Sequence, residues 1–249
     1  MKRMWELKQS AGGELNLYIY GDVRGDDYDW WGDVIESETS ANHFRQELEK
    51  HPNVAEIHIF INSYGGSVFE GTAIYNQLKR HPARKVVHVD GFACSIASVI
   101  AMAGDEIIMP ANALMMVHNM WMGVYGNAAE LRKAADDLDT INAAGRKAYL
   151  SRTGDKLSEE KLTEMMDAET WLTAEQCIAY GLADRYADEE ADMTEAKEIL
   201  QKANLDTQQR INLQKSLAAQ LRQLTGSEAN PKDPKKDPKS ENPIVKMFC

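Results

Sequence analysis

The sequence contains little of three things that would narrow its class at once: cysteine, long apolar runs and positive charge. Its 249 residues include three cysteines, Cys94, Cys177 and Cys249, without CxxC spacing. An odd number of scattered thiols argues against a disulfide framework and against a zinc cage. No apolar run approaches the ~18 residues of a membrane span, and the charged start over 1–6 lacks the apolar stretch of a secretory signal. We therefore expect a cytoplasmic protein without a membrane partner.

Basic residues are outnumbered as well. The chain has 28 Lys and Arg against 39 Asp and Glu, a formal net charge of −11. Nucleic-acid binding needs an excess of positive charge to neutralise phosphates, so this balance argues against a nucleic-acid partner. The hydrophobic share of 43% and the charged share of 27% are those of an ordinary globular protein.

Proline placement divides the chain. Four of the seven prolines fall within 226–249, a segment too poor in apolar side chains to offset the entropy of ordering. Residues 189–225 are polar and rich in helix formers, and a narrow leucine stripe there suits either a partner helix or the chain's own domain: Leu213, Leu217, Leu221 and Leu224. We expect a folded domain over 1–188, a polar helical extension over 189–225 and a disordered tail over 226–249.

The first region alternates strand and helix patterns. Apolar or alternating runs predict strands over 15–20, 54–61, 85–90, 106–109 and 114–118. Helical patterns occupy 40–50, the segment around Ile74 and Leu78, 95–103 and 127–152, and a capping box starts another helix at Thr173. Alternating strands and helices predict an α/β fold with a mainly parallel sheet and flanking helices.

Three short motifs follow predicted strands, where the carboxyl edge of a parallel sheet collects functional groups. Gly65 and Gly66 end an apolar strand and lead into a helix, where bare backbone N–H groups are accessible. Taken alone, the pair is more simply interpreted as an ordinary strand-to-helix turn. The loop is not a Walker motif, so we expect no nucleotide site.

Ser95 follows the next strand and opens a helix between the small residues Ala93 and Ala97. A hydroxyl at a helix start lies beside unpaired N–H groups that can bind a developing oxyanion. The simpler interpretation is a helix N-cap. The chain lacks GxSxG, which excludes the nucleophile elbow of α/β-hydrolases.

His118 ends a third apolar strand, and a structural histidine is its simpler interpretation. The other five histidines have no neighbouring nucleophile motif, and no His, Cys or carboxylate spacing indicates a metal. Together, however, glycine N–H groups, a serine and a histidine at one sheet edge are the components of acyl transfer. Asp167 and Glu169 offer a carboxylate to orient the imidazole.

These motifs resemble the Clp protease proteolytic subunit (ClpP) family of serine peptidases, which implies a ClpP/crotonase-like fold with a protruding handle helix. The resemblance covers roughly residues 14–188 and rests on the runs INSYGGSVFEG at 61–71, ACSIAS at 93–98, MMVH at 115–118, WLTAEQ at 171–176 and YGLAD at 180–184. A phage and prophage branch of ClpP-like head maturation proteases shares the Trp30-Trp31-Gly32, Ala103-Gly104-Asp105 and Glu169-Thr170-Trp171 runs.

The resemblance implies a role for each matching residue. Ser95 matches the nucleophile, His118 the general base, and the N–H groups of Gly66 and Ile96 the oxyanion hole. Glu169 stands where the family normally has Asp, with Asp167 as the alternative acid. Segments 65–70 and 123–127 match the strands that line the peptide, so Gly65, Ser67 and Val68 are expected to bind substrate.

The resemblance also implies an assembly. The helix over 127–152 matches the handle through which two heptameric rings stack as a tetradecamer, and the family works with an AAA+ unfoldase that uses the ATP. The N-terminus does not match the family's gating loops, which favours processing of phage capsid or scaffold proteins in prohead maturation over housekeeping proteolysis. No cofactor and no metal are implied.

Two further alternatives remain at this stage. One is a crotonase-type acyl-CoA enzyme, which also uses paired N–H donors, and the other is a non-catalytic shell or scaffold protein that keeps the fold. Residues from 189 onward are also a candidate for removal by self-cleavage.

Overall fold

The structure is a computed structural model that describes residues 5–9, 14–37 and 39–187. These residues belong to the first of two units into which the chain divides, Met1–Ala203, and the second unit, Asn204–Cys249, lies outside them. The predicted extension over 189–225 with its leucine stripe, and the predicted tail over 226–249, also lie outside the described residues. None of the helices in this described part combines the length and apolar character needed to cross a membrane.

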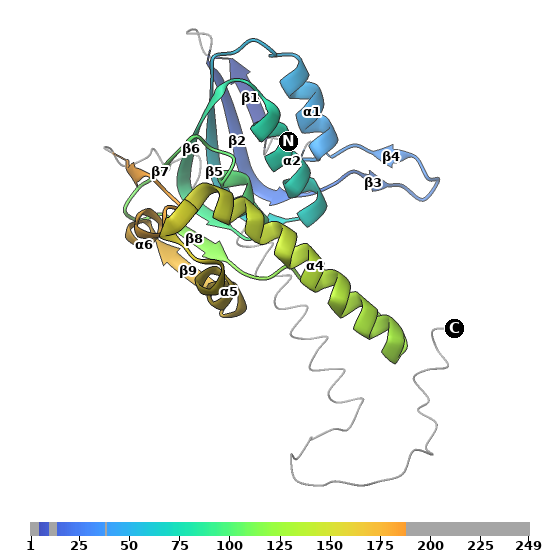
Figure 1. Cartoon of the computed structure of the whole chain (residues 1–249). Helices are drawn as coiled ribbons and strands as arrows, with labels where there is room; N and C mark the ends of the chain where they lie inside the picture. Colours follow the sequence, from blue (N-terminus) through green and yellow to red (C-terminus); the bar gives the residue numbers. More distant parts are fainter. Residues whose placement is uncertain (1–4, 10–13, 38, 188–249) are drawn as a thin grey trace, which may run out of the picture. The chain divides into compact units, whose positions relative to one another are not determined.

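A mainly parallel sheet forms the centre of the fold (Figure 1). Its main path runs β1 (Trp5–Gln9), β2 (Leu15–Val23), β5 (Glu56–Gly66), β6 (Arg84–Cys94), β7 (Glu106–Met109) and β10 (Arg185–Tyr186). Two further strands, β8 (Leu114–Val117) and β9 (Thr170–Thr173), extend it, and β3 (Asp27–Tyr28) and β4 (Val34–Ile35) form a separate hairpin. Only the β1–β2 and β8–β9 pairs in the large sheet are antiparallel among the described strands.

The five predicted helices are present with small changes in their bounds: α1 (Ala41–Glu49), α2 (Val68–Arg80), α3 (Ile96–Ala101), α4 (Ala128–Thr153) and α6 (Ala174–Tyr180). The structure adds α5 (Glu159–Asp167), which the sequence patterns did not predict, and a short 3-10 turn at Gly154–Lys156. Asn127 forms a reciprocal capping box with Glu130, and the predicted box at Thr173 forms with Gln176. These elements confirm the predicted α/β fold class.

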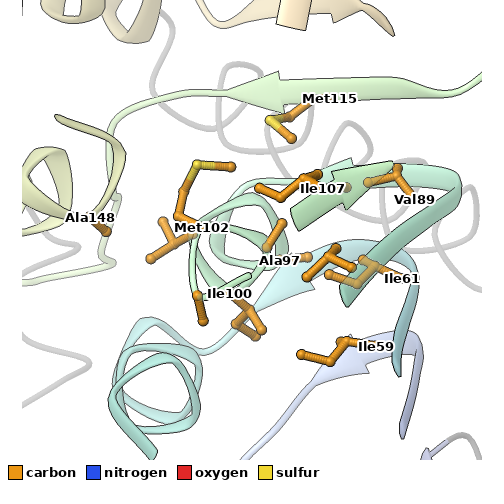
Figure 2. Close-up of a cluster of buried hydrophobic side chains, with 14 of the residues drawn as sticks. Ile59, Ile61, Val89, Ala97, Ile100, Met102, Ile107, Met115 and Ala148 are labelled. Carbon is orange, nitrogen blue, oxygen red and sulfur yellow. The ribbon is translucent and has the colours of Figure 1, made fainter. Parts of the chain in front are cut away.

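The core lies where α3 packs on the sheet. All six residues of α3 are buried, as expected for a helix covered on every side. Figure 2 shows Ala97 and Ile100 of α3 in the same buried cluster as Ile61 of β5 and Ile107 of β7. Gly71 of α2 approaches α3 so closely that an added Cβ would lie 2.2 Å from Ile96 Cγ1. This packing fixes the first turn of α3, where Ser95 enters the helix.

Strand β6 has two successive neighbours on one side, and this fork positions the site. Its first half pairs with β7 through Val86–His88, and its last residues, Phe92–Cys94, pair with β8. The Ser95 N–H continues the second pairing by donating to Met116 O at 2.9 Å. The ends of β6 and β8 are therefore adjacent, which brings Ser95 and His118 together.

Candidate active site

Ser95 lies at the junction of β6 and α3 in an unusual backbone conformation, with φ 55° and ψ −130°. Positive φ is costly for any residue with a Cβ, and such strain persists only where the surroundings enforce it. The Ser95 side chain makes no capping hydrogen bond to α3. Ser95 therefore occupies the N-cap position of α3, but its side chain does not cap the helix and its hydroxyl faces another partner.

That partner is His118. The residue directly follows β8, and its Nε2 lies 2.7 Å from Ser95 Oγ. Burial lowers the pKa of His118 below its ordinary value, and the negative charge of Glu169 acts in the opposite direction. The imidazole is therefore largely neutral near pH 7, the state in which Nε2 can accept the serine proton.

Both candidate acids lie near His118 but have different partners. Strand β9 runs antiparallel to β8 with Thr170 opposite Val117, so the residues that flank this pair, Glu169 and His118, approach each other. Glu169 has a positive φ of 50° and acts on the imidazole through its charge. The Asp167 carboxylate accepts a hydrogen bond of 2.7 Å from Asn119 Nδ2 instead.

Gly65 passes directly against the serine, and Gly66 passes against Val23 of β2. Gly65 has φ 101°, and an added Cβ would lie 2.7 Å from Ser95 Cβ and 3.1 Å from Ile96 N. Gly66 has φ 145°, and a Cβ there would lie 2.1 Å from Val23 O. Ile96 is the first residue of α3, a position whose N–H has no partner within its own helix. The Gly65-Gly66 turn and the α3 N-terminus thus border the space beside Ser95.

Hydrogen bonds hold this turn in place. The Ser63 hydroxyl donates to Gly21 O and accepts from Gly65 N at 3.0 Å. Ser67 N donates to Val23 O at 2.8 Å, and Ser67 Oγ accepts from Glu70 N, which caps α2. A frame of β2, β5 and α2 therefore sets the glycine conformation before any substrate binds.

The expected peptide-lining strands are only partly present. β5 ends at Gly66, Ser67 is the N-cap of α2 and Val68 is its first residue, so the expected strand over 65–70 is wrong beyond Gly66. Residues 123–127 form no strand in the described chain. β5 ends at Gly66 because the Ser67 side chain accepts a hydrogen bond from Glu70 N and so caps the first turn of α2. Exposed Phe69 and Tyr125 lie on these two segments, and exposed Trp121 lies just before the second.

The structure also contains groupings that sequence spacing did not indicate. Ser98 and Tyr149, 51 positions apart, are in hydrogen-bond contact behind Ser95. Potential metal-ligand atoms of Glu14, Glu56 and His58 lie within 4.8 Å of one another, although Glu56 is also paired with Arg84. The second grouping arises because neighbouring strand starts align in the sheet, which no single-segment pattern reveals.

These observations define a class of protein: an α/β serine hydrolase, in which parallel strands deliver a serine, a histidine and backbone N–H groups to one sheet edge. Residues 32–190 match the sequence pattern of the family described as Clp protease. The chain belongs to this family of serine peptidases.

Three relatives give the extent of the similarity. An ATP-dependent Clp protease proteolytic subunit 3 of Rhodococcus jostii is 33% identical over 132 residues, 52% of this chain and 64% of the relative, which is less than two thirds of its length. The proteolytic subunit of Deinococcus radiodurans is 29% identical over 189 residues, 74% of this chain and 91% of the relative. Subunit 1 of Streptomyces avermitilis is 32% identical over 157 residues, 61% and 71% of the two chains.

Proposed function

We propose that the chain is a serine endopeptidase in which Ser95 is the nucleophile, His118 the general base and Glu169 the residue that stabilises the imidazolium. The single observation that supports this most is the 2.7 Å contact between His118 Nε2 and Ser95 Oγ at a strained strand-to-helix junction. Family membership favours a peptidase over the acyl-CoA enzyme considered above.

In this mechanism, Ser95 Oγ attacks the carbonyl carbon of the peptide bond while its proton passes to His118 Nε2. The N–H groups of Gly66 and Ile96 stabilise the oxyanion of the tetrahedral intermediate. The imidazolium then protonates the leaving amine, and an acyl-enzyme remains on Ser95. His118 removes a proton from water, the hydroxide cleaves the ester, and the proton returns to Ser95.

Substrate is proposed to bind in an extended conformation beside Gly65, Ser67 and Val68, with backbone hydrogen bonds along the end of β5. Members of the Clp protease family form stacked rings and work with Clp ATPases. For this chain we propose a homo-oligomeric ring, supported by the exposed first half of α4 and by exposed Trp121 and Tyr125 just before it.

Two biological roles are in competition. Prohead maturation is supported by the resemblance of the Trp30-Trp31-Gly32 run, in the β3–β4 hairpin, to ClpP-like phage proteases. Housekeeping proteolysis is favoured by the relatives, whose names include "ATP-dependent". ATP-independent cleavage of a phage scaffold protein would support the first role, and cleavage of an unfolded protein only with a Clp ATPase and ATP would support the second.

The test of the chemistry is labelling by a fluorophosphonate probe together with cleavage of a fluorogenic peptide. Wild-type protein should be labelled on Ser95, and Ser95→Ala should lose both labelling and cleavage. Ser151→Ala, which alters an exposed serine on α4, should retain both. A folded wild-type protein that is neither labelled nor active would overturn the proposal and favour a non-catalytic scaffold protein.

A further inference from the structure

Behind Ser95, a buried chain of hydroxyl groups connects the nucleophile to α4. Ser98 lies one turn further along α3 with none of its surface exposed, and Tyr149 of α4 is 1% exposed. Ser98 Oγ donates to Ser95 O at 2.6 Å and lies 2.6 Å from Tyr149 Oη. A serine hydroxyl has one proton, so Tyr149 must be the donor in the second contact. The direction is therefore Tyr149 to Ser98 to Ser95.

The same hydroxyl also lies close to the strand that bears the histidine. Ser98 Oγ is 3.3 Å from Met116 O, and this carbonyl accepts the Ser95 N–H at 2.9 Å. Met116 precedes His118 by two residues at the end of β8. Both peptide groups of Ser95 and the end of β8 are thus fixed by one local network.

The hydrogen bonds of this network act on the strained backbone of Ser95. A φ of 55° persists only where neighbouring groups hold it, and the Ser95 carbonyl accepts from both Ser98 N, at 3.0 Å, and Ser98 Oγ. Tyr149 fixes the Ser98 hydroxyl from the opposite side. Burial raises the pKa of the Tyr149 phenol, so it stays a proton donor across the working pH range of a serine peptidase.

We propose that Ser98 and Tyr149 are positioning residues that hold Ser95 in its strained, reactive conformation and connect this conformation to α4. The inference rests on the proposed role of Ser95 as the nucleophile. Neither side chain contacts substrate in this scheme, since both act through the Ser95 carbonyl.

The test measures kcat, KM and the rate constant of fluorophosphonate labelling for Tyr149→Phe, Ser98→Ala and the double variant, with Tyr75→Phe as the matched control. Tyr75 is a partly buried tyrosine of α2 packed against the same core. We expect Tyr149→Phe to lower kcat and the labelling rate constant together by about tenfold, with KM changed less than twofold. The double variant should be no slower than the slower single variant, because the two hydroxyls act in series.

Folding and assembly are checked by circular dichroism and sedimentation, and rates are compared only for folded protein of wild-type size. If Tyr149→Phe does not fold, the same rate measurements on Ser98→Ala, which leaves the tyrosine ring in place, test the inference. Wild-type labelling rates in the folded variants, or a loss equal to that of Tyr75→Phe, would overturn the inference. A wild-type protein that is not labelled would instead overturn the proposed function.

Discussion

At the scale of residues, the two acids near His118 are distinguished by their partners. The Asp167 carboxylate is bound by Asn119, whereas Glu169 acts on the imidazole through its charge. A negative charge near His118 stabilises the imidazolium that forms during the reaction. We therefore expect Glu169→Gln and Asp167→Asn to have different effects on kcat/KM.

Glu169→Gln should lower kcat/KM by roughly 10²-fold, because the imidazolium loses its counter-charge. Since the Glu169 charge raises the pKa of His118, its removal should also move the acid limb of the kcat/KM profile to lower pH. Asp167→Asn is the matched control and should stay within about threefold of wild type. Peptide cleavage measured from pH 5 to 9 tests this prediction. A large loss in Asp167→Asn with little change in Glu169→Gln would instead assign stabilisation of the imidazolium to Asp167.

The glycine turn gives a second residue-scale prediction. Gly65→Ala places a Cβ 2.7 Å from Ser95 Cβ, and Gly66→Ala places one 2.1 Å from Val23 O. Either change should lower kcat/KM by at least about 10²-fold, the loss typical of one missing oxyanion donor. Gly32→Ala is the control, since it shares a positive φ but has open space around the added atom. Wild-type activity in Gly66→Ala would contradict the proposed oxyanion hole.

Sequence reasoning was successful for residues whose position follows from a strand end. Ser95 and His118 both follow predicted strands, and parallel strands end at one edge. Taken alone, Ser95 was interpreted more simply as a helix cap, because that interpretation assumed an ordinary helix start and could not foresee φ 55°. Ser98 and Tyr149 were missed because their contact depends on the packing of α4 against α3, which local periodicity does not specify.

At the scale of elements, the expected strand over 65–70 shows how competing patterns are resolved. The run Ser67-Val-Phe-Glu70 has the spacing of a helix start, and Ser67 does cap α2. Local capping therefore takes precedence over the extended conformation expected from the resemblance. The residue pattern, in which Gly65 and Gly66 end a strand and lead into a helix, was thus a better guide here than the resemblance.

A buried acid links two strands of the sheet across β5. Tyr20 of β2 donates to Asp90 of β6, and burial raises the pKa of Asp90 to about 6 despite this hydrogen bond. Between the ordinary carboxyl pKa and about 6, the folded chain keeps a proton that the unfolded chain has lost. Stability contributed by this group is therefore lost as pH rises through that window.

Asp90→Asn should remove this penalty while keeping an oxygen that can accept from Tyr20. We expect the variant to be more stable than wild type by about 2 kcal/mol at pH 8, with a melting temperature higher by about 4–8 °C. The difference should vanish near pH 4. Asp137→Asn, at an exposed position of α4, should show no such pH dependence. Thermal unfolding at pH 4, 6 and 8 provides the measurement, and a variant that is less stable at pH 8 would contradict the prediction.

At the scale of the whole molecule, the described fold and the family match end close together. β10 ends at Tyr186 and the match ends at residue 190. The order of β2, β5, β6, β7 and β8 and of the helices among them could be predicted from the sequence because each of these elements has a clear period, whereas β1, β3, β4, β9, β10 and α5 were not predicted. The fork of β6 between β7 and β8 could not, since it depends on pairing between segments far apart along the chain.

A chain truncated after residue 190 should therefore fold and cleave a short fluorogenic peptide with kcat/KM within about threefold of the full chain. The reason is that every residue proposed to act in catalysis lies within the described fold. Steady-state kinetics and sedimentation of both forms measure this, with full-length Ser95→Ala as the activity blank. Loss of activity in a folded truncated chain would show that residues beyond 190 contribute to the site or to assembly.

The exposed tryptophans have a practical consequence. Trp30, Trp31 and Trp121 have 94%, 84% and 73% of their surface exposed, and Trp171 has 48%. They lie on the β3–β4 hairpin, on the segment before α4 and on β9, three different segments of the chain. Indole emission shifts to shorter wavelength when water is removed from the ring. The chain thus has its own unlabelled optical reporters, and single Trp→Phe changes would tell which of these segments becomes covered when copies of the chain, or a substrate, bind.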